Sequence, residues 1–315
     1  MKMPAIIFAI AATVLLAGCS GSKFPHNRTD ELGRKQGYWT ETYENGDMFE
    51  GHYVDGNRRG PWSVRSADGV AGECLYVKDY DHGDCILRDS DGNVFEGPLV
   101  NGKKHGRWVL RGIGGQVDKG PFVNGKRHGQ WIERYADGAV AEGSFVNGIL
   151  HGHWVMRHAN GDVEEGLVVD GKRHGHWVWR YADGGVHEGT YEGGKKTGFW
   201  VLRGANGQVD KGRLVDGKKH GKWILRTADG GVQEGPYVND RKHGQWVARF
   251  ASGNVQEGPF VNGKKNGLWT VWFANGTMAE GPYLDNETHG NWVFLDADGN
   301  VVLKKCYESG NEIGC

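Results

Sequence analysis

A single 23-residue period runs through almost the whole chain and limits what the chain can fold into. One position of the period is tryptophan in eleven copies and cysteine in the remaining one. Glycine stands two residues before this position and seven residues after it in all twelve copies. Periods of about 20 to 50 residues are typical of repeat arrays, whose core forms by stacking neighbouring units. The sequence therefore predicts one array rather than several ordinary globular domains. The residues that mark the period are Trp39, Trp62, Cys85, Trp108, Trp131, Trp154, Trp177, Trp200, Trp223, Trp246, Trp269 and Trp292.

Each unit contains short alternating apolar runs separated by Asp-Gly or Asn-Gly pairs, such as residues 137–138 and 147–148. Turns of this kind require a positive φ, which glycine adopts without steric cost, so the pairs predict β-hairpins. Glycine makes up 54 of the 315 residues, and glycine every few positions opposes a helix. We predict an all-β chain with an elongated single antiparallel β-sheet, built from about twelve 23-residue repeats over residues 37–303. A divergent cap follows over residues 304–315.

The first 18 residues have the pattern of a targeting segment. Lys2 precedes an uncharged apolar run over residues 5–17, which is too short for a mature transmembrane helix of about 20 residues. The run ends in L-A-G-C at residues 16–19, which resembles the lipobox of a bacterial lipoprotein signal peptide. The resemblance implies removal of residues 1–18 and attachment of lipid, palmitate included, to Cys19.

Residues 19–36 show no apolar period and predict a lipidated N-terminus followed by a flexible tether. Ser20, which is not acidic, follows Cys19. By the same resemblance, this favours the outer membrane over the inner membrane of a bacterial cell envelope, with the protein facing the periplasm or the surface.

The repeat itself resembles a known family. Residues 257–269 read E-G-P-F-V-N-G-K-K-N-G-L-W, which is similar to the bacterial variant of the MORN repeat, E-G-x-[YF]-V-x-G-K-x-H-G-x-W. The resemblance covers about residues 36–303 and implies consecutive hairpins in one long sheet. It also implies roles in scaffolding, membrane association or protein binding rather than catalysis. Tryptophan replaces the second small glycine of the eukaryotic pattern, which leaves phospholipid binding open.

Two charged columns follow the same period. Arginine stands three residues after the tryptophan position in nine consecutive copies, from Arg65 to Arg249. Glutamate precedes the E-G glycine in most copies, with Lys119 and Lys211 as exceptions. These columns predict an Arg/Glu ladder across neighbouring strands. A one-residue change of register would move one column to the other face, so the pattern leaves the pairing open.

Four further cysteines predict two disulfides. Cys74 occupies a glycine position and Cys85 the tryptophan position of the same unit, so both departures fall across one predicted hairpin. Cys306 and Cys315 frame the divergent end, where a bridge would close a cap. Two bridges are in keeping with an oxidising envelope compartment. Free or metal-bound thiols are the alternative, although the sequence has no C-x2-C pair.

The remaining motifs do not predict an enzyme. The formal net charge of -1 opposes a nucleic-acid partner. A recurring G-x4-G-K resembles a phosphate loop but lacks the following Ser or Thr and the helix that such loops need. Eight loop histidines recur at a spacing of about 9.6 Å, which is too wide to share a metal. We expect no catalytic residue, cofactor or metal site.

The columns favour a non-catalytic, membrane-anchored scaffold that binds an envelope protein or a second copy of itself. The alternative is a surface that binds glycan, peptidoglycan or lipid headgroups on repeated Trp and Tyr columns, each ring contributing about 1 kcal/mol. A third interpretation places the tryptophans in the core. The candidate binding column consists of Trp108, Trp131, Trp154, Trp177, Trp200, Trp223 and Trp246.

Overall fold

The computed structural model describes residues 26–77 and 80–315. The predicted signal peptide and the predicted lipid-bearing Cys19 lie outside these residues. The described residues divide into two compact units, one formed by those up to residue 90 together with 100–102 and the other by residues 91–99 and 103–315. Each unit is described by itself.

The first unit contains six strands. They are β1 (Arg28–Thr29), β2 (Lys35–Thr42), β3 (Met48–Val54), β4 (Asn57–Arg65), β5 (Ala71–Val77) and β6 (Tyr80–Arg88). The strands of the second unit begin with β7 (Val94–Val100), β8 (Lys103–Lys104), β9 (Gly106–Arg111), β10 (Val117–Val123), β11 (Lys126–Arg127), β12 (Gly129–Arg134), β13 (Val140–Val146), β14 (Ile149–Arg157), β15 (Val163–Val169), β16 (Lys172–Arg180), β17 (Val186–Glu192) and β18 (Lys195–Arg203). They continue with β19 (Val209–Val215), β20 (Lys218–Arg226), β21 (Val232–Val238), β22 (Arg241–Lys242), β23 (Gly244–Arg249), β24 (Val255–Val261), β25 (Lys264–Lys265), β26 (Gly267–Trp272), β27 (Met278–Leu284), β28 (Glu287–Thr288), β29 (Gly290–Leu295), β30 (Val301–Glu308) and β31 (Asn311–Ile313).

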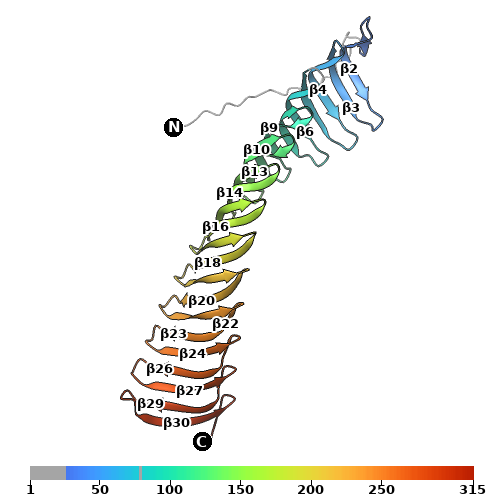
Figure 1. Cartoon of the computed structure of the whole chain (residues 1–315). Coiled ribbons are helices and arrows are strands. Elements are labelled where there is room, and N and C mark those ends of the chain that lie inside the picture. The colour runs from blue at the N-terminus through green and yellow to red at the C-terminus, as the bar shows by residue number, and fades with distance from the viewer. Residues whose placement is uncertain (1–25, 78–79) are drawn as a thin grey trace, which may run out of the picture. The chain divides into compact units, whose positions relative to one another are not determined.

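The strands pair antiparallel with their neighbours along the chain. In the second unit, β13 through β21 form one continuous series of hairpins, and the series goes on to the C-terminal strands (Figure 1). All 31 strands belong to an antiparallel sheet, and the described residues contain no helix. The predicted all-β class and the single antiparallel sheet of consecutive hairpins are confirmed.

A contact between tryptophan and glycine, which we call the Trp–Gly lock, recurs in the regular repeats. In β15 and β16, Trp177 lies opposite Gly166, and the register shifts directly after this glycine. A Cβ atom on Gly166 would approach Cδ2 of Trp177 to 2.4 Å, so only glycine leaves room for the indole. The Trp177 Nε1 donates a hydrogen bond to the Leu167 carbonyl oxygen at 2.9 Å. The shifted register thus supplies the acceptor that a buried indole needs.

The tryptophans form the core of the sheet. Nine of those that mark the period are buried, including Trp177 at 1% exposure and Trp200 at 0%, whereas Trp39 and Trp154 are half-buried. Tyrosine or phenylalanine rings lie between them. Tyr237, for example, contacts Trp223 and Trp246 edge-on at centroid distances of 6.2 and 5.2 Å. The interpretation of the column as core is therefore confirmed for these nine rings.

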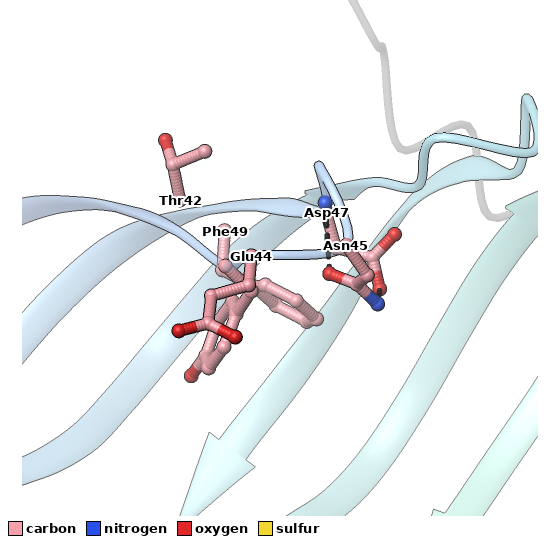
Figure 2. Close-up of a pocket in the computed structure, with 6 residues that line it drawn as sticks. Thr42, Glu44, Asn45, Asp47 and Phe49 are labelled. Atoms are coloured by element: carbon pink, nitrogen blue, oxygen red, sulfur yellow. Dashed lines mark hydrogen bonds between the residues drawn. The ribbon is translucent and has the colours of Figure 1, made fainter.

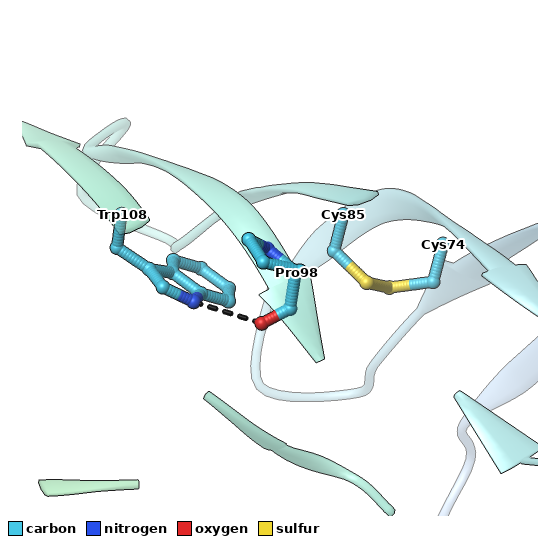
Figure 3. The surroundings of a disulfide bond; sticks show 4 residues. All are labelled: Cys74, Cys85, Pro98 and Trp108. Atoms are coloured by element: carbon cyan, nitrogen blue, oxygen red, sulfur yellow. Dashed lines mark hydrogen bonds between the residues drawn. A yellow bond between two sulfur atoms is a disulfide. The ribbon is translucent and has the colours of Figure 1, made fainter. Parts of the chain in front are cut away.

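Both predicted disulfides are present. Cys74 lies opposite Cys85 in the register of β5 and β6, where a regular repeat has its glycine and tryptophan, and the two cysteines are bonded. Figure 3 draws this bridge and also the hydrogen bond from Trp108 Nε1 to the Pro98 carbonyl oxygen, which belongs to a regular lock. Cys306 in β30 is bonded to Cys315, and β30 pairs with the short β31. The bridged C-terminal cap is therefore a further hairpin.

The predicted tether is shorter than the sequence indicated. Within residues 19–36, β1 already pairs with the start of β2, with Arg28 opposite Gln36. The Asp30 carboxylate holds the connecting turn by accepting hydrogen bonds from the backbone N–H groups of Leu32 and Arg34. A two-residue strand fixed by one side chain has no apolar period, so pattern analysis missed it.

Candidate functional site: a row of cations on the tryptophan face

The Arg/Glu ladder forms on the face opposite the tryptophans. In β15 and β16, Trp177 and Gly166 share one face, which we call the tryptophan face, while Glu165 and Arg180 share the other. The Arg180 guanidinium contacts the Glu165 carboxylate at 2.5 Å, and three further Arg/Glu pairs repeat this arrangement at 2.7 to 3.6 Å. The predicted ladder is confirmed in these four pairs. The pairs are solvent-exposed, so each contributes little to stability.

The tryptophan face carries a second charged column, which sequence analysis missed. A basic residue four positions before the tryptophan extends over the indole ring, and its charged group lies 4.1 to 4.8 Å from the ring centroid. A cation above an indole face is attracted by the ring quadrupole. The column consists of Lys35, Arg58, Lys104, Arg127, Arg173, Lys196, Lys219, Lys242 and Lys265.

The Trp154 repeat lacks the cation and packs differently from the others. Leu150 replaces the basic residue there, and Trp154 is only half-buried. The indole also turns: a Cβ atom on Gly143 would meet Cε3 of Trp154 at 2.3 Å, whereas the other regular repeats present Cδ2 to the glycine. The cation is not required for the regular packing, because Trp292, with Thr288 at the same position, is buried and presents Cδ2 to Gly281.

From Arg127 onward, the residue nine positions before the cation contacts its charged group in five of the six repeats that have a cation. We call it the partner position. Asp118 accepts from Arg127 at 2.9 Å, and Glu164 accepts from Arg173 at 2.6 Å. Arg127 also pairs with Glu133. In these repeats the carboxylates balance the guanidinium charge.

The partner position changes character along the second unit. Asp210 still pairs with Lys219 at 3.3 Å. The next two lysines have an uncharged amide instead: Lys242 donates to the Gln233 Oε1 atom at 2.8 Å, and Lys265 donates to the Gln256 Oε1 atom at 3.2 Å. The partner position of Lys196 is His187. We call Lys196, Lys219, Lys242 and Lys265 the lysine row.

The electrostatic setting of the lysine row follows from this composition. Burial, followed by the charges of Lys219 and Lys265, holds the pKa of Lys242 below its ordinary value. Burial alone lowers the pKa of Lys265, and burial together with the Arg173 charge lowers that of Lys196. Lys242 therefore senses the charges of the lysines on both sides of it, and a nearby anion would stabilise its charged form.

The candidate binding column does not offer open tryptophan rings. Trp108, Trp131, Trp177, Trp200, Trp223 and Trp246 are exposed by 2% or less, and Trp154 is half-buried. The glycine of the lock lies against the indole, and a cation lies over the ring in six of these seven repeats, with Leu150 at that position in the Trp154 repeat. Stacking of sugars on these ring faces would require displacing the lysines and arginines, so the cations are the groups that a ligand can reach.

The loop histidines stay separate from one another. Three of them, His105, His128 and His289, have a buried Nδ1 atom without a hydrogen-bond partner. Each donates its backbone N–H to the carbonyl oxygen of a proline, such as Pro98 for His105. Within residues 26–77 and 80–315, no group of three or more His, Cys, Asp or Glu side chains has the geometry to hold a metal.

A shallow hollow lies beside the turn between β2 and β3, and the contacts of that turn explain it. Its lining includes Thr42, Glu44, Asn45, Asp47 and Phe49 (Figure 2). Asn45 accepts the backbone N–H of Asp47 and donates its amide to the Asp47 carboxylate at 2.8 Å. These contacts are those of an Asx turn, so the polar groups already serve the hairpin.

Comparison with known proteins leaves the family open. No protein-family model matches the chain, and no curated protein does either. No helix in the described part of the chain is long and apolar enough to cross a membrane.

Several solved structures share limited similarity. The TCP domain of Drosophila melanogaster SAS-4 (dCPAP), in complex with a proline-rich motif of Ana2 (dSTIL), has 16% identity and a TM-score of 0.28, covering 56% of this chain and 89% of that one. The TCP10 domain of Danio rerio CPAP has 12% identity and a TM-score of 0.24, with coverages of 85% and 99%. Virginiamycin B lyase from Staphylococcus aureus has 11% identity and a TM-score of 0.15, with coverages of 79% and 92%. TM-scores this low carry no argument about function.

Proposed function

We propose that the protein is a non-catalytic interaction scaffold, anchored to a membrane of the bacterial envelope by lipid on Cys19. Its repeats fit the resemblance to bacterial MORN-variant arrays, because they are consecutive hairpins with glycine turns. We favour the outer membrane, on the grounds of Ser20 at the position after the lipidated cysteine. The partner is an envelope protein or a second copy of the chain.

The observation that carries this proposal is the recurrence of one side-chain arrangement from repeat to repeat. In eight repeats a cation lies over the tryptophan, the tryptophan lies on a glycine, and the indole N–H donates to the carbonyl oxygen of the residue after that glycine. Equivalent groups therefore recur at intervals of two strands, or about 9.6 Å. A partner that contacts one repeat finds the same chemistry in the next, as repeat scaffolds require.

Stacking of glycan on the tryptophans receives no support from the packing. A sugar ring needs an open aromatic face, and Trp200 and Trp223 are fully buried. Lipid headgroups would have to bind the cations rather than the rings. We therefore keep protein binding as the proposed function.

Cross-linking of the native lipoprotein in its own envelope, followed by mass spectrometry, tests this function. We expect a specific envelope protein or specific self-links in the native sample. A Cys19→Ala variant is the matched control, because it lacks the thiol that takes the lipid. Equal recovery from both samples would contradict the anchored part of the proposal, and recovery of glycan fragments alone would contradict the scaffold.

A further inference from the structure

The lysine row carries more positive charge than its surroundings balance. Among the strand residues of the tryptophan face between β17 and β27, the cations are the four lysines and the one carboxylate is Asp210. The turns beside them also contribute acids: the Asp240 carboxylate accepts the backbone N–H of Lys219 at 2.7 Å, and two others pair with exposed lysines. Asp216 pairs with Lys195 at 3.1 Å, and Asp285 pairs with Lys264 at 3.2 Å. An acidic ligand would supply the missing counter-charge.

The lysines of the row are held in place rather than free in solvent. Their Nζ atoms lie 4.6, 4.4, 4.1 and 4.1 Å from the centroids of Trp200, Trp223, Trp246 and Trp269. Each side chain is half-buried. A fixed cation loses little further entropy when it binds an anion, so the row is preorganised.

The spacing of the row restricts what can bind to it. Successive lysines lie on strands two apart, which places them about 9.6 Å from each other. A polypeptide in the polyproline II conformation has three residues per turn and rises about 3.1 Å per residue, or about 9.3 Å per turn. Side chains on every third residue then lie on one side of the segment, at nearly the interval of the lysines.

We propose that the lysine row binds an extended acidic polypeptide segment with a carboxylate on every third residue. This inference rests on the proposed scaffold function and names the chemistry of its partner. Four such carboxylates reach from Lys196 to Lys265. Three of them pair with Lys196, Lys242 and Lys265, and the fourth shares the amine of Lys219 with Asp210.

The packing favours a slender peptide over a bilayer or a glycan. The amines are recessed against the indoles, as the 24% exposure of the Lys219 side chain shows, and a narrow chain reaches such groups more readily than a flat membrane. A glycan would need the ring faces that the lysines occupy. A peptide carboxylate needs the amine alone.

Titration of the full chain with a synthetic peptide tests the inference. The probe has twelve residues, with Glu at every third position and Ser or Thr between, and its binding is followed by calorimetry at low and raised salt. We expect saturable binding that weakens with salt. A Gln-for-Glu peptide and a peptide with its four Glu residues adjacent are the matched probes, and both bind more weakly.

Neighbouring residues of the same turn supply the protein controls. A Lys242→Gln/Lys265→Gln variant loses two ion pairs, so its affinity for the probe falls by about tenfold or more. Lys218→Gln with Arg241→Gln removes the same charge from exposed residues just before Lys219 and Lys242, and leaves the affinity near that of the native chain. Equal losses in the two variants, or no loss in either, would overturn the proposal.

Two competitors complete the test. Vesicles of phosphatidylcholine with phosphatidylglycerol are offered to the Cys19→Ala chain, and a uronic-acid oligosaccharide is offered to the native chain. Tighter binding of either than of the peptide, lost in Lys242→Gln/Lys265→Gln, would overturn the assignment of a polypeptide. Failure of the peptide to bind while envelope cross-linking still recovers a partner would reject this inference and leave the scaffold function standing.

Discussion

Two stretches of the tryptophan face share one architecture and differ in charge. Between β10 and β16 the strand residues of this face carry two arginines and three carboxylates, and the arginines are paired. Between β17 and β27 the same positions carry four lysines and one carboxylate. We call them the balanced stretch and the lysine stretch. Both have the same lock of tryptophan on glycine beneath the cations.

The comparison shows that the Trp–Gly lock does not depend on the net charge of the surface above it. The lock uses the tryptophan, the glycine opposite it and the carbonyl at the register shift, and these recur in both stretches. The charge depends on the partner position, which is Asp118 or Glu164 in the balanced stretch and Gln233 or Gln256 in the lysine stretch. Substitutions at the partner position can therefore change what the surface binds without changing the fold.

The largest expected effect comes from removing the lock in each stretch. Trp131→Ala and Trp246→Ala each delete a buried indole, and we expect losses of about 3–5 kcal/mol in both. Chemical denaturation of the full chain, with hydrogen exchange to locate the damage, measures this. Trp272→Ala is the control, because Trp272 is half-buried and lies outside the column, so its loss should be smaller. A large cost in only one stretch would show that the two locks are not equivalent.

Breaking the ion pair between Asp118 and Arg127 should lower the free energy of unfolding by less than removing a tryptophan does. Asp118 is buried at 6% exposure and accepts from Arg127 at 2.9 Å. We expect Asp118→Asn to destabilise the balanced stretch by about 1–2 kcal/mol, because a charged hydrogen bond in a covered site is lost. Asp285→Asn is the control, since its pair with Lys264 is exposed and worth well under about 1 kcal/mol. Equal melting temperatures for the two variants would argue against a role of burial.

The reverse change should make the lysine stretch resemble the balanced one. Gln233→Glu places a carboxylate beside Lys242, and we expect a gain of up to about 1 kcal/mol. The same variant should bind the acidic peptide more weakly, because Lys242 is already neutralised. Gln245→Glu adds the same charge on the opposite face, where Gln245 is exposed and pairs in register with Pro259. If Gln245→Glu weakened peptide binding as much, long-range charge rather than the lysine row would explain the effect.

Sequence analysis predicted the features whose residues recur at the same position in successive repeats. The tryptophan and glycine positions predicted the hairpins, and Cys74 and Cys85 predicted a bridge because both depart from their columns in one unit. The cations were missed although nine of twelve repeats have one. The second basic residue of G-K-K-H looks like part of an exposed turn, and only the register shift after the glycine places it over the indole. The face on which each column lies depends on that shift, which no pattern indicates.

The smallest expected effect lies at the boundary between the two stretches, where His187 holds the partner position. Burial, followed by the nearby Lys196 charge, lowers the pKa of His187 below its ordinary 6.5. Its ring also contacts Tyr181, with 3.0 Å between His187 Nδ1 and the hydroxyl. As the pH falls below about 6.5, the unfolded chain takes up a proton that the folded chain does not yet bind. Stability should therefore fall from there down to the folded-state pKa, and this loss should be absent in His187→Gln.

Thermal unfolding of the native chain and of His187→Gln from pH 8 to pH 5 measures this difference, since the other histidines are common to both. We expect the two melting temperatures to run parallel above pH 7 and to converge or cross as the pH falls. A Lys196→Gln background removes one cause of the lowered pKa of His187. It should therefore narrow the pH range over which the stability falls. A constant difference at every pH would show that the site between the balanced and lysine stretches does not respond to protons, and the partner position would then act through fixed charge alone.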